Sequence, residues 1–168
     1  MWVELPAVWI AVLNVLAIPA IHMGVSWLFT RLPRALFRPG GSLFRERLWE
    51  DGGRFYERFM AIRTWKGWLP DAAPWFDGFA KKSLARRDPD YLRAFRAETC
   101  RSEAAHYAQI PALLLTVAWN PWPVAASVMT AYALASNLPC IVLQRHTRHR
   151  MARLLAALTK RGRTPGRK

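Results

Sequence analysis

The sequence predicts an all-α integral membrane protein, formed as a single membrane domain over residues 1–168. About three transmembrane helices and basic amphipathic interfacial helices on the cytoplasmic side are expected. Hydrophobic residues make up 52% of the chain, yet the formal net charge is +14. Lys and Arg are absent from residues 1–30 and 102–144 and abundant in the other segments. Such separation of charge from apolar sequence is typical of membrane proteins and argues against a soluble nucleic-acid-binding protein.

The first predicted crossing covers residues 5–29, a run of twenty-five residues without a formal charge. A bilayer core requires about 20 consecutive apolar residues, so this run is long enough to span it. No positive region precedes it, and it exceeds the apolar core of an ordinary signal peptide. We therefore expect a retained transmembrane helix.

A second apolar region predicts a transmembrane hairpin with arms at residues 104–119 and 124–143. The sequence WNPWP at 119–123 separates the arms, because proline and asparagine favour a turn. Three crossings result, and the first arm of the hairpin is short for a bilayer.

The helix of this short arm is expected to begin well before the apolar residues. Asp88 suits the N-cap position and Pro89 the first helical position, and no helix breaker follows until Pro111. One continuous helix would thus rise from the cytoplasm and enter the bilayer near residue 104.

The distribution of basic residues predicts the orientation of the chain. Segment 31–101 contains sixteen Lys and Arg residues and tail 145–168 contains nine, so both are expected in the cytoplasm. The amino terminus and the turn at 119–123 then lie outside. These assignments describe a multi-pass protein of the cell (plasma) membrane with a cytoplasmic carboxyl terminus.

Within the basic segment, residues 54–69 (RFYERFMAIRTWKGWL) align Phe55, Phe59 and Ile62 on one helical stripe. This pattern predicts a basic amphipathic helix lying in the headgroup region. The alternative is a solvated helix packed on a small cytoplasmic core. Residues 70–82 are rich in proline, glycine and aromatic residues and predict an irregular interfacial loop.

A dense polar cluster, ETCRSEAAHY at residues 98–107, stands at the start of the apolar hairpin. On a helix, Glu98 and His106 share one broad face, and Glu103 flanks it three residues before His106. Glu103 is therefore expected to accept a hydrogen bond from one imidazole nitrogen of His106. The other nitrogen would then serve as a general base.

The third predicted crossing carries a second polar stripe, in which Asn137, Cys140, Gln144 and Arg148 recur at spacings of three and four. Because the two hairpin arms are antiparallel, this stripe and the first cluster reach the same membrane depth. Unpaired polar groups are costly there, so the two sets should pair or bind something. The candidate catalytic residues are His106, Glu103 and Glu98. The candidate substrate-binding residues are Arg101, Asn137, Gln144, Arg145 and Arg148.

Two other interpretations stay open at the level of sequence. The spacing Glu103-x-x-His106 matches that of carboxylate-bridged di-iron sites, although residues 104–168 contain no Asp or Glu. A membrane metalloenzyme with one metal would complete its ligands from His22, His146 and His149. Alternatively, the polar groups join helices in a non-enzymatic membrane scaffold subunit. The preferred interpretation expects no metal.

Three blocks occur in order across roughly residues 30–150: RERLWEDGGRFYERF, ETCRSEAAHY and NLPCIVLQRHTRHR. Together they resemble the glycosyl-4,4'-diaponeurosporenoate acyltransferase family, small integral-membrane acyltransferases of the staphyloxanthin pathway type. The resemblance implies a transferase of carotenoid biosynthesis or of another lipid pathway. It would move a fatty acyl group onto a sugar hydroxyl of a membrane glycolipid, either a glycosyl carotenoid or another one.

The resemblance and the polar cluster together lead to one functional expectation. His106 deprotonates the acceptor hydroxyl, and Glu103 or Glu98 orients the imidazole of His106. The oxyanion or the sugar would be held by Asn137, Gln144 or Arg145. The donor is a cytoplasmic thioester, acyl-CoA or acyl carrier protein, whose phosphates arginine side chains could hold. No cofactor beyond this donor is expected. The partners are membrane lipids, the glycolipid acceptor and the donor, without nucleic acid, and a homo-oligomer that completes the site is left open.

Overall fold

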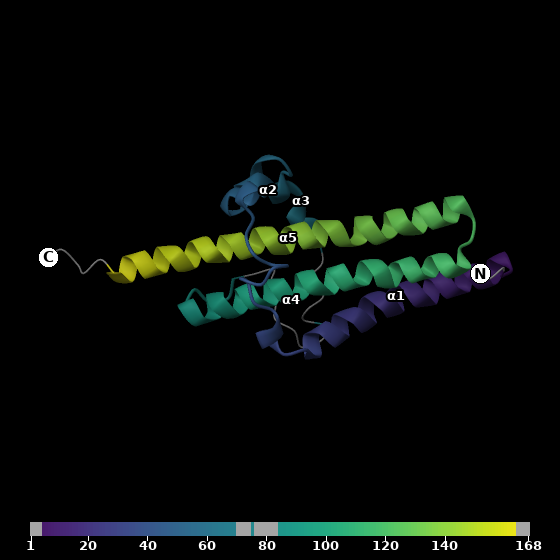
Figure 1. Cartoon of the computed structure of the whole chain (residues 1–168), viewed down its shortest axis with the longest axis horizontal. Coiled ribbons are helices and arrows are strands. Elements are labelled where there is room, and N and C mark those ends of the chain that lie inside the picture. Colours follow the sequence, from purple (N-terminus) through teal and green to yellow (C-terminus); the bar gives the residue numbers. More distant parts are fainter. Residues whose placement is uncertain (1–4, 70–74, 76–83, 164–168) are drawn as a thin grey trace.

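The computed structural model describes residues 5–69, 75 and 84–163, and these residues form helices and connecting turns without a strand (Figure 1). Three long helices form the body, namely α1 (Ala7–Arg31), α4 (Pro89–Leu114) and α5 (Pro123–Arg163). The short elements are η1 (Arg34–Leu36), η2 (Leu48–Gly53), α2 (Arg54–Arg58), α3 (Ile62–Trp65), η3 (Lys66–Trp68) and η5 (Leu115–Trp119). The predicted all-α class is therefore confirmed.

Helix α4 lies between α1 and α5 and runs antiparallel to both (Figure 1). The amino terminus and the α4–α5 turn lie at one end of the molecule, and the carboxyl terminus lies at the other. Helix α1 covers only the half of α4 nearest the turn. Beyond it, α4 and α5 continue as a two-helix extension, with α2 and α3 packed beside the middle of α5.

Two helices are long and apolar enough to cross a bilayer, α1 and the Pro123–Lys160 part of α5. Length and composition thus support two spans, where the sequence predicted three. The difference lies in α4. Its apolar stretch is shortened at one end by the polar residues Glu103, His106 and Gln109, and at the other end the α-helix gives way to the 3-10 helix η5.

The predicted start of α4 is confirmed. The side chain of Asp88 accepts a hydrogen bond of 2.9 Å from the backbone N–H of Tyr91, and Pro89 occupies the first helical position. The helix then continues past the cluster at 98–107 and through Pro111. The polar cluster and the apolar arm therefore belong to one rigid element.

Helix α1 is joined to the α4–α5 turn by a reciprocal amide pair. Asn14 and Asn120 each donate to the other's Oδ1 at 3.0 Å, and the Trp119 indole N–H donates to Asn14 Oδ1 at 2.9 Å. Buried amide groups must be hydrogen-bonded, so this contact fixes the register of α1 against the turn.

A group of polar contacts centred on Gln109 joins all three long helices about two turns further along α1. Gln109 Nε2 donates to Ser26 Oγ at 3.1 Å and to the His22 carbonyl at 3.2 Å. Its Oε1 must therefore accept from His22 Nδ1 at 3.2 Å, and His22 Nε2 accepts from the Tyr132 hydroxyl at 3.2 Å. His22 thus has both ring nitrogens engaged within the helix bundle.

The continuous amphipathic helix predicted for residues 54–69 is wrong. Ala61 adopts a left-handed conformation with φ of 45°, which ends α2 and starts α3 in a new direction. The predicted apolar stripe is divided as a result: Ile62 is fully buried, whereas Phe59 is exposed. The loop predicted at 70–82 lies outside the described residues, apart from residue 75.

Candidate functional site

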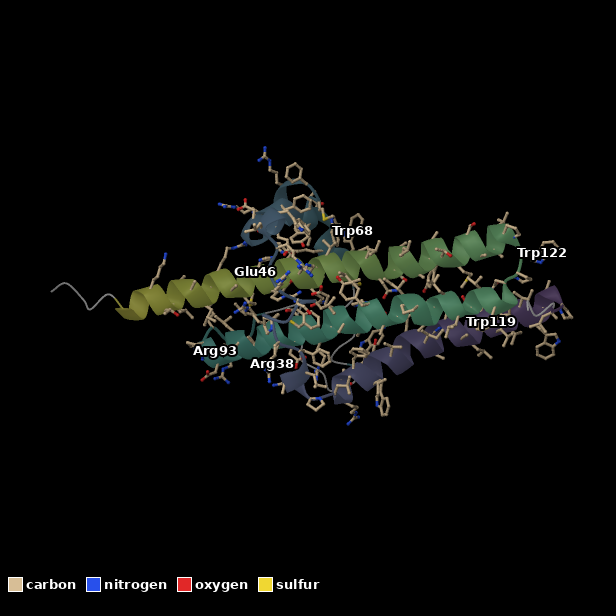
Figure 2. The ribbon with its side chains drawn as sticks, in the orientation of Figure 1. Arg38, Glu46, Trp68, Arg93, Trp119 and Trp122 are labelled. Carbon is tan, nitrogen blue, oxygen red and sulfur yellow. The ribbon has the colours of Figure 1, made fainter. Side chains whose placement is uncertain are left out.

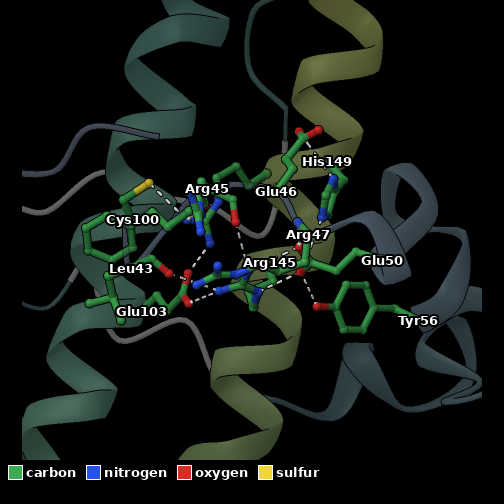
Figure 3. Close-up of polar contacts among 12 residues, drawn as sticks. Leu43, Arg45, Glu46, Arg47, Glu50, Tyr56, Cys100, Glu103, Arg145 and His149 are labelled. Carbon is green, nitrogen blue, oxygen red and sulfur yellow. Dashed lines mark hydrogen bonds and ion pairs between the residues drawn. The ribbon is translucent and has the colours of Figure 1, made fainter. Parts of the chain in front are cut away.

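The polar residues of α4 and α5 form two neighbouring layers between these helices. The first layer, here the carboxylate–arginine cluster, consists of Glu50, Glu103, Arg145 and Arg148 (Figure 3). The second layer, the His106–Asn137 pair, lies nearer the apolar part of the bundle. Both layers draw on residues that the sequence analysis selected, with the exception of Glu50.

Arg145 is the centre of the carboxylate–arginine cluster. Its Nε and Nη2 donate to the two oxygens of Glu50 at 2.7 and 3.1 Å, and its Nη1 donates to Glu103 Oε1 at 2.8 Å. The carbonyls of Leu43 and Arg45 accept at 3.3 and 3.2 Å. All five guanidinium N–H groups therefore have an acceptor, which is the full donor capacity of an arginine.

Arg148 completes the charge balance of the cluster. Its Nη2 donates to Glu103 Oε2, and its Nη1 donates to the Phe44 carbonyl at 3.2 Å. The side chains of Glu50 and Glu103 are fully buried, so their charges require such partners. Two carboxylates and two guanidinium groups thus neutralise each other inside the fold.

A tight turn in η2 presents Glu50 to α5. Gly52 and Gly53 follow with φ of 60° and 91°, in the region that favours glycine. A Cβ at Gly53 would also come within 2.7 Å of His149 Cβ, so only glycine lets the turn approach α5 this closely. Arg153 Nη1 donates to the Gly52 carbonyl and holds the turn against α5.

The surroundings of Glu50 hold it in the ionised form. Burial acts to raise the pKa of Glu50, but hydrogen bonds from Arg145, the Tyr56 hydroxyl and the Arg47 amide outweigh burial and lower it to about 2. The Tyr56 hydroxyl donates to Glu50 Oε1 at 2.5 Å. The pKa of Tyr56 is raised, mainly by burial and to a smaller extent by this hydrogen bond. Tyr56 is therefore a neutral hydrogen-bond donor at physiological pH.

Glu98 and Arg101, two predicted site residues, join α4 to the end of α1. Arg101 Nη2 pairs with Glu98 Oε2 at 2.7 Å, and its Nη1 donates to the Thr30 carbonyl at 3.0 Å. A guanidinium at the last carbonyls of a helix is favourable because it meets unpaired acceptors and the helix dipole. Eight residues, about 12 Å of helix rise, separate Glu98 from His106, so Glu98 is a packing residue here.

His106 is oriented by Asn137 and not by Glu103. His106 Nδ1 lies 2.9 Å from Asn137 Oδ1, while Asn137 Nδ2 donates to the Ala133 carbonyl at 2.9 Å and to Ser136 Oγ at 3.1 Å. Since the amide nitrogen of Asn137 is occupied as a donor, its oxygen must accept, and His106 Nδ1 carries the proton. With Nδ1 engaged in this way, Nε2 is the ring nitrogen that can act as a general base.

The expected hydrogen bond between Glu103 and His106 is thus corrected. Both Glu103 oxygens accept from arginines of α5, because a fully buried carboxylate is stabilised far more by two guanidinium groups than by one neutral imidazole. A spacing of three residues on one helix allowed the pairing with His106, and the neighbouring helix determined the outcome.

Gln144 is another predicted site residue on the polar stripe of α5. Its side chain is buried, and its Oε1 finds no hydrogen-bond partner among the residues that the structure describes. It stands seven residues after Asn137 and four before Arg148, on the same stripe of α5. A buried amide oxygen without a partner is a candidate ligand for a hydroxyl group.

Glu50 and Tyr56 were not predicted as site residues from the sequence. The signal was present in the block RERLWEDGGRFYERF, where the Asp-Gly-Gly that follows Glu50 marks a tight turn able to present a side chain. Its partner Arg145 lies 95 residues away, so no local pattern indicated the contact.

The mononuclear metal set proposed from the sequence is not assembled. His22 contacts Gln109 and Tyr132, whereas His146 contacts Glu57 and His149 lies beside Glu50. Over residues 5–69, 75 and 84–163, no group of three or more His, Cys, Asp or Glu side chains is arranged to hold a metal ion.

Comparison with known proteins defines the class of this helical protein as a small acyltransferase. The family described as glycosyl-4,4'-diaponeurosporenoate acyltransferase matches residues 40–157, an interval that contains both polar layers. The chain belongs to this family, which confirms the resemblance seen in the sequence and its prediction of an acyltransferase.

Curated relatives from Staphylococcus aureus carry the same name, glycosyl-4,4'-diaponeurosporenoate acyltransferase. The relative from strain USA300 is 27% identical over 144 residues, which cover 84% of this chain and 86% of the relative. The relative from strain MRSA252 is 28% identical over the same length. No solved structure gives a significant match to the chain.

The first prediction concerns Glu50 and the pH dependence of stability. The folded pKa of about 2 lies below the ordinary value of 4.5, so the contribution of Glu50 is fully present above the ordinary value and is lost as the pH falls toward 2. Glu50→Gln should lower the free energy of unfolding by about 3 kcal/mol at neutral pH, since it leaves Arg145 buried with one anionic partner fewer.

Unfolding in detergent, followed at a series of pH values, measures this difference. The gap between wild type and Glu50→Gln should close as the pH is lowered. The matched control is Asp51→Asn, the same chemical change at an exposed neighbouring position, which should stay within about 0.5 kcal/mol of wild type. Parallel pH profiles for wild type and Glu50→Gln would contradict the role of Glu50.

Proposed function

We propose that this chain is an integral-membrane O-acyltransferase. It moves a fatty acyl group from a cytoplasmic thioester donor, acyl-CoA or acyl carrier protein, to a sugar hydroxyl of a membrane glycolipid. The observation that carries the proposal is the His106–Asn137 pair, in which Asn137 Oδ1 accepts from His106 Nδ1 and orients the imidazole. The relatives' name, which specifies a glycosylated diaponeurosporenoate, supports a glycosyl carotenoid as the acceptor.

The exposed surface of the long helices supports a place in the membrane. Helix α1 has no buried residue, and apolar side chains such as Trp9 and Leu16 are more than half exposed. A contiguous apolar surface of this size is unfavourable in water and favourable against lipid tails. Since α4 lies between α1 and α5, its apolar half would cross with them. The basic residues of the opposite end orient that end to the cytoplasm.

In the proposed mechanism, His106 Nε2 takes the proton from the sugar hydroxyl as its oxygen attacks the thioester carbonyl. Asn137 Oδ1 accepts from Nδ1–H throughout and stabilises the imidazolium that forms. The tetrahedral intermediate then collapses, the C–S bond breaks, and the thiolate takes the proton back from His106. The products are the O-acylated sugar and the free thiol of the donor.

Among the proposed substrate ligands, Gln144 has a buried side-chain oxygen that no described residue bonds. The Asn137 amide N–H groups and all five Arg145 N–H groups are occupied within the protein, and Arg148 is held by Glu103. We therefore assign to Gln144 the contact with the sugar hydroxyl, and to the arginines the positioning of α4 against α5.

The second prediction tests the base. In cells that express His106→Ala, untargeted lipidomics should show loss of an acylated glycolipid that wild type produces, with transfer reduced about 10²–10⁴-fold. Ser127→Ala is the matched control, because Ser127 is exposed and bonds only to its own helix, at the Pro123 carbonyl. His106→Ala protein that inserts, folds and keeps full transfer activity would remove His106 from the mechanism. A lipidome that does not change when the gene is removed would favour a scaffold.

The third prediction separates substrate contact from packing at Gln144. Gln144→Leu should lower kcat/KM for the glycolipid about 10–100-fold, because a hydroxyl loses its acceptor. Stability should be unchanged or higher, since the substitution removes a buried amide oxygen that lacks a partner. Thermal unfolding and steady-state kinetics on the same preparation give both values. A drop in stability with unchanged kinetics would show that Gln144 is a packing residue.

A further inference from the structure

A set of large apolar side chains stands exposed beside the carboxylate–arginine cluster. We name it the aromatic ledge. Its members come from η2, from the α2–α3 junction and from η3, and they are Leu48, Trp49, Phe59, Met60 and Trp68. Trp68 is 87% exposed, and Leu48 is fully exposed. Surface clusters of this kind mark an interaction site.

The ledge is built on a fixed base and is not a frayed loop. Tyr56 is 1% exposed and is bonded to Glu50, and Ile62 is fully buried beneath the ledge. Aromatic contacts lead outward from this base: the Phe55 ring lies 5.0 Å from that of Trp49 and 5.2 Å from that of Phe59. The rings of Trp49 and Phe59 are therefore presented by a packed aromatic stack.

Basic side chains accompany these rings. Residues 45–69 contain six Lys and Arg against four Asp and Glu. Of the four acids, Glu50 is buried against Arg145, and Glu46 lies 3.3 Å from His149 Nδ1. The Arg58 guanidinium lies over the Phe59 ring at 5.3 Å from its centroid. Exposed aromatics with arginine beside them suit the headgroup region of an anionic leaflet, where the rings enter the interface and the cations meet phosphate.

The ledge also stands at the level where α5 changes from apolar to basic sequence. Its base is attached to Arg145 and lies beside His149, and Trp68 projects beside the middle of α5 (Figure 2). If α1 and the apolar part of α5 lie in the bilayer, as proposed above, this level is the cytoplasmic lipid–water boundary. The ledge would then lie in the plane of that boundary.

We infer that the aromatic ledge inserts into the headgroup region of an anionic inner leaflet. Through Glu50 and Arg145 it sets the depth at which the carboxylate–arginine cluster sits. This inference rests on the proposed place in the membrane, but it concerns a different surface. It also replaces the predicted amphipathic helix at 54–69, whose stripe faces both inward and outward, with a set of residues from three elements.

The fourth prediction is tested by fluorescence quenching in nanodiscs of phosphatidylcholine with or without phosphatidylglycerol. A reporter on Trp68→Cys, in a background in which Cys100 and Cys140 are replaced by alanine, should be quenched several-fold more by shallow nitroxide lipids than a reporter on Arg93→Cys. The difference should grow with phosphatidylglycerol. Arg93 is the control because it is exposed on the two-helix extension, away from the ledge (Figure 2).

A third reporter on Val15→Cys separates the two proposals. Quenching at Val15 without quenching at Trp68 overturns the ledge and leaves the membrane placement intact. Lack of quenching at all three sites overturns the membrane placement itself. Shielding of Trp68 that depends on protein concentration in detergent indicates a second copy as the occupant, and it also overturns the inference.

Hydrogen–deuterium exchange on the wild-type chain provides a measurement without substitutions. Phosphatidylglycerol should increase protection across residues 45–69 and leave the extension of α4 around residues 89–96 unchanged. Equal effects of the lipid on both regions would count against a specific ledge.

Discussion

Arg145 of α5 uses all five of its guanidinium N–H groups on two other stretches of chain, and the arrangement of the half of the molecule that contains α2 and α3 depends on it. The segment at 43–50 contributes two carbonyls and Glu50, helix α4 contributes Glu103, and α5 supplies the arginine. Without this cation, buried Glu50 would lose its guanidinium partner and buried Glu103 would keep only Arg148, so the desolvation penalty of both carboxylates would be less fully offset. The turn with Gly52 and Gly53, the buried Tyr56 and the aromatic ledge all take their positions from this contact.

The same contact also determines which residue His106 pairs with. Arg145 and Arg148 pair with both oxygens of Glu103, so His106 is paired with the neutral amide of Asn137 and not with a carboxylate. A carboxylate partner would favour the protonated imidazole, whereas Asn137 fixes the tautomer without adding charge. The proposed base and the charged groups that stabilise the fold thereby lie in adjacent but separate layers.

Features that depend on neighbouring residues, such as helix starts, could be predicted from the sequence. Asp88 and Pro89 marked the start of α4 correctly, because capping requires only neighbouring residues. The break at Ala61 was missed, because alanine is a good helix former and gives no local signal of a left-handed backbone. The contact of Glu50 with Arg145 spans 95 residues and leaves no periodic trace, so only the folded chain reveals it. The 98–107 cluster was correctly singled out as a group of interacting polar residues, but the partners of Glu103 are arginines of the neighbouring helix α5.

A double-mutant cycle on Arg145→Met and Glu103→Gln tests the central claim that one arginine joins these segments. The free energies of unfolding in detergent should show a coupling of about 2 kcal/mol between the two positions, and Arg145→Met alone should abolish hydrogen-exchange protection across residues 43–53. Additive single substitutions, with residues 43–53 still protected in Arg145→Met, would contradict the account.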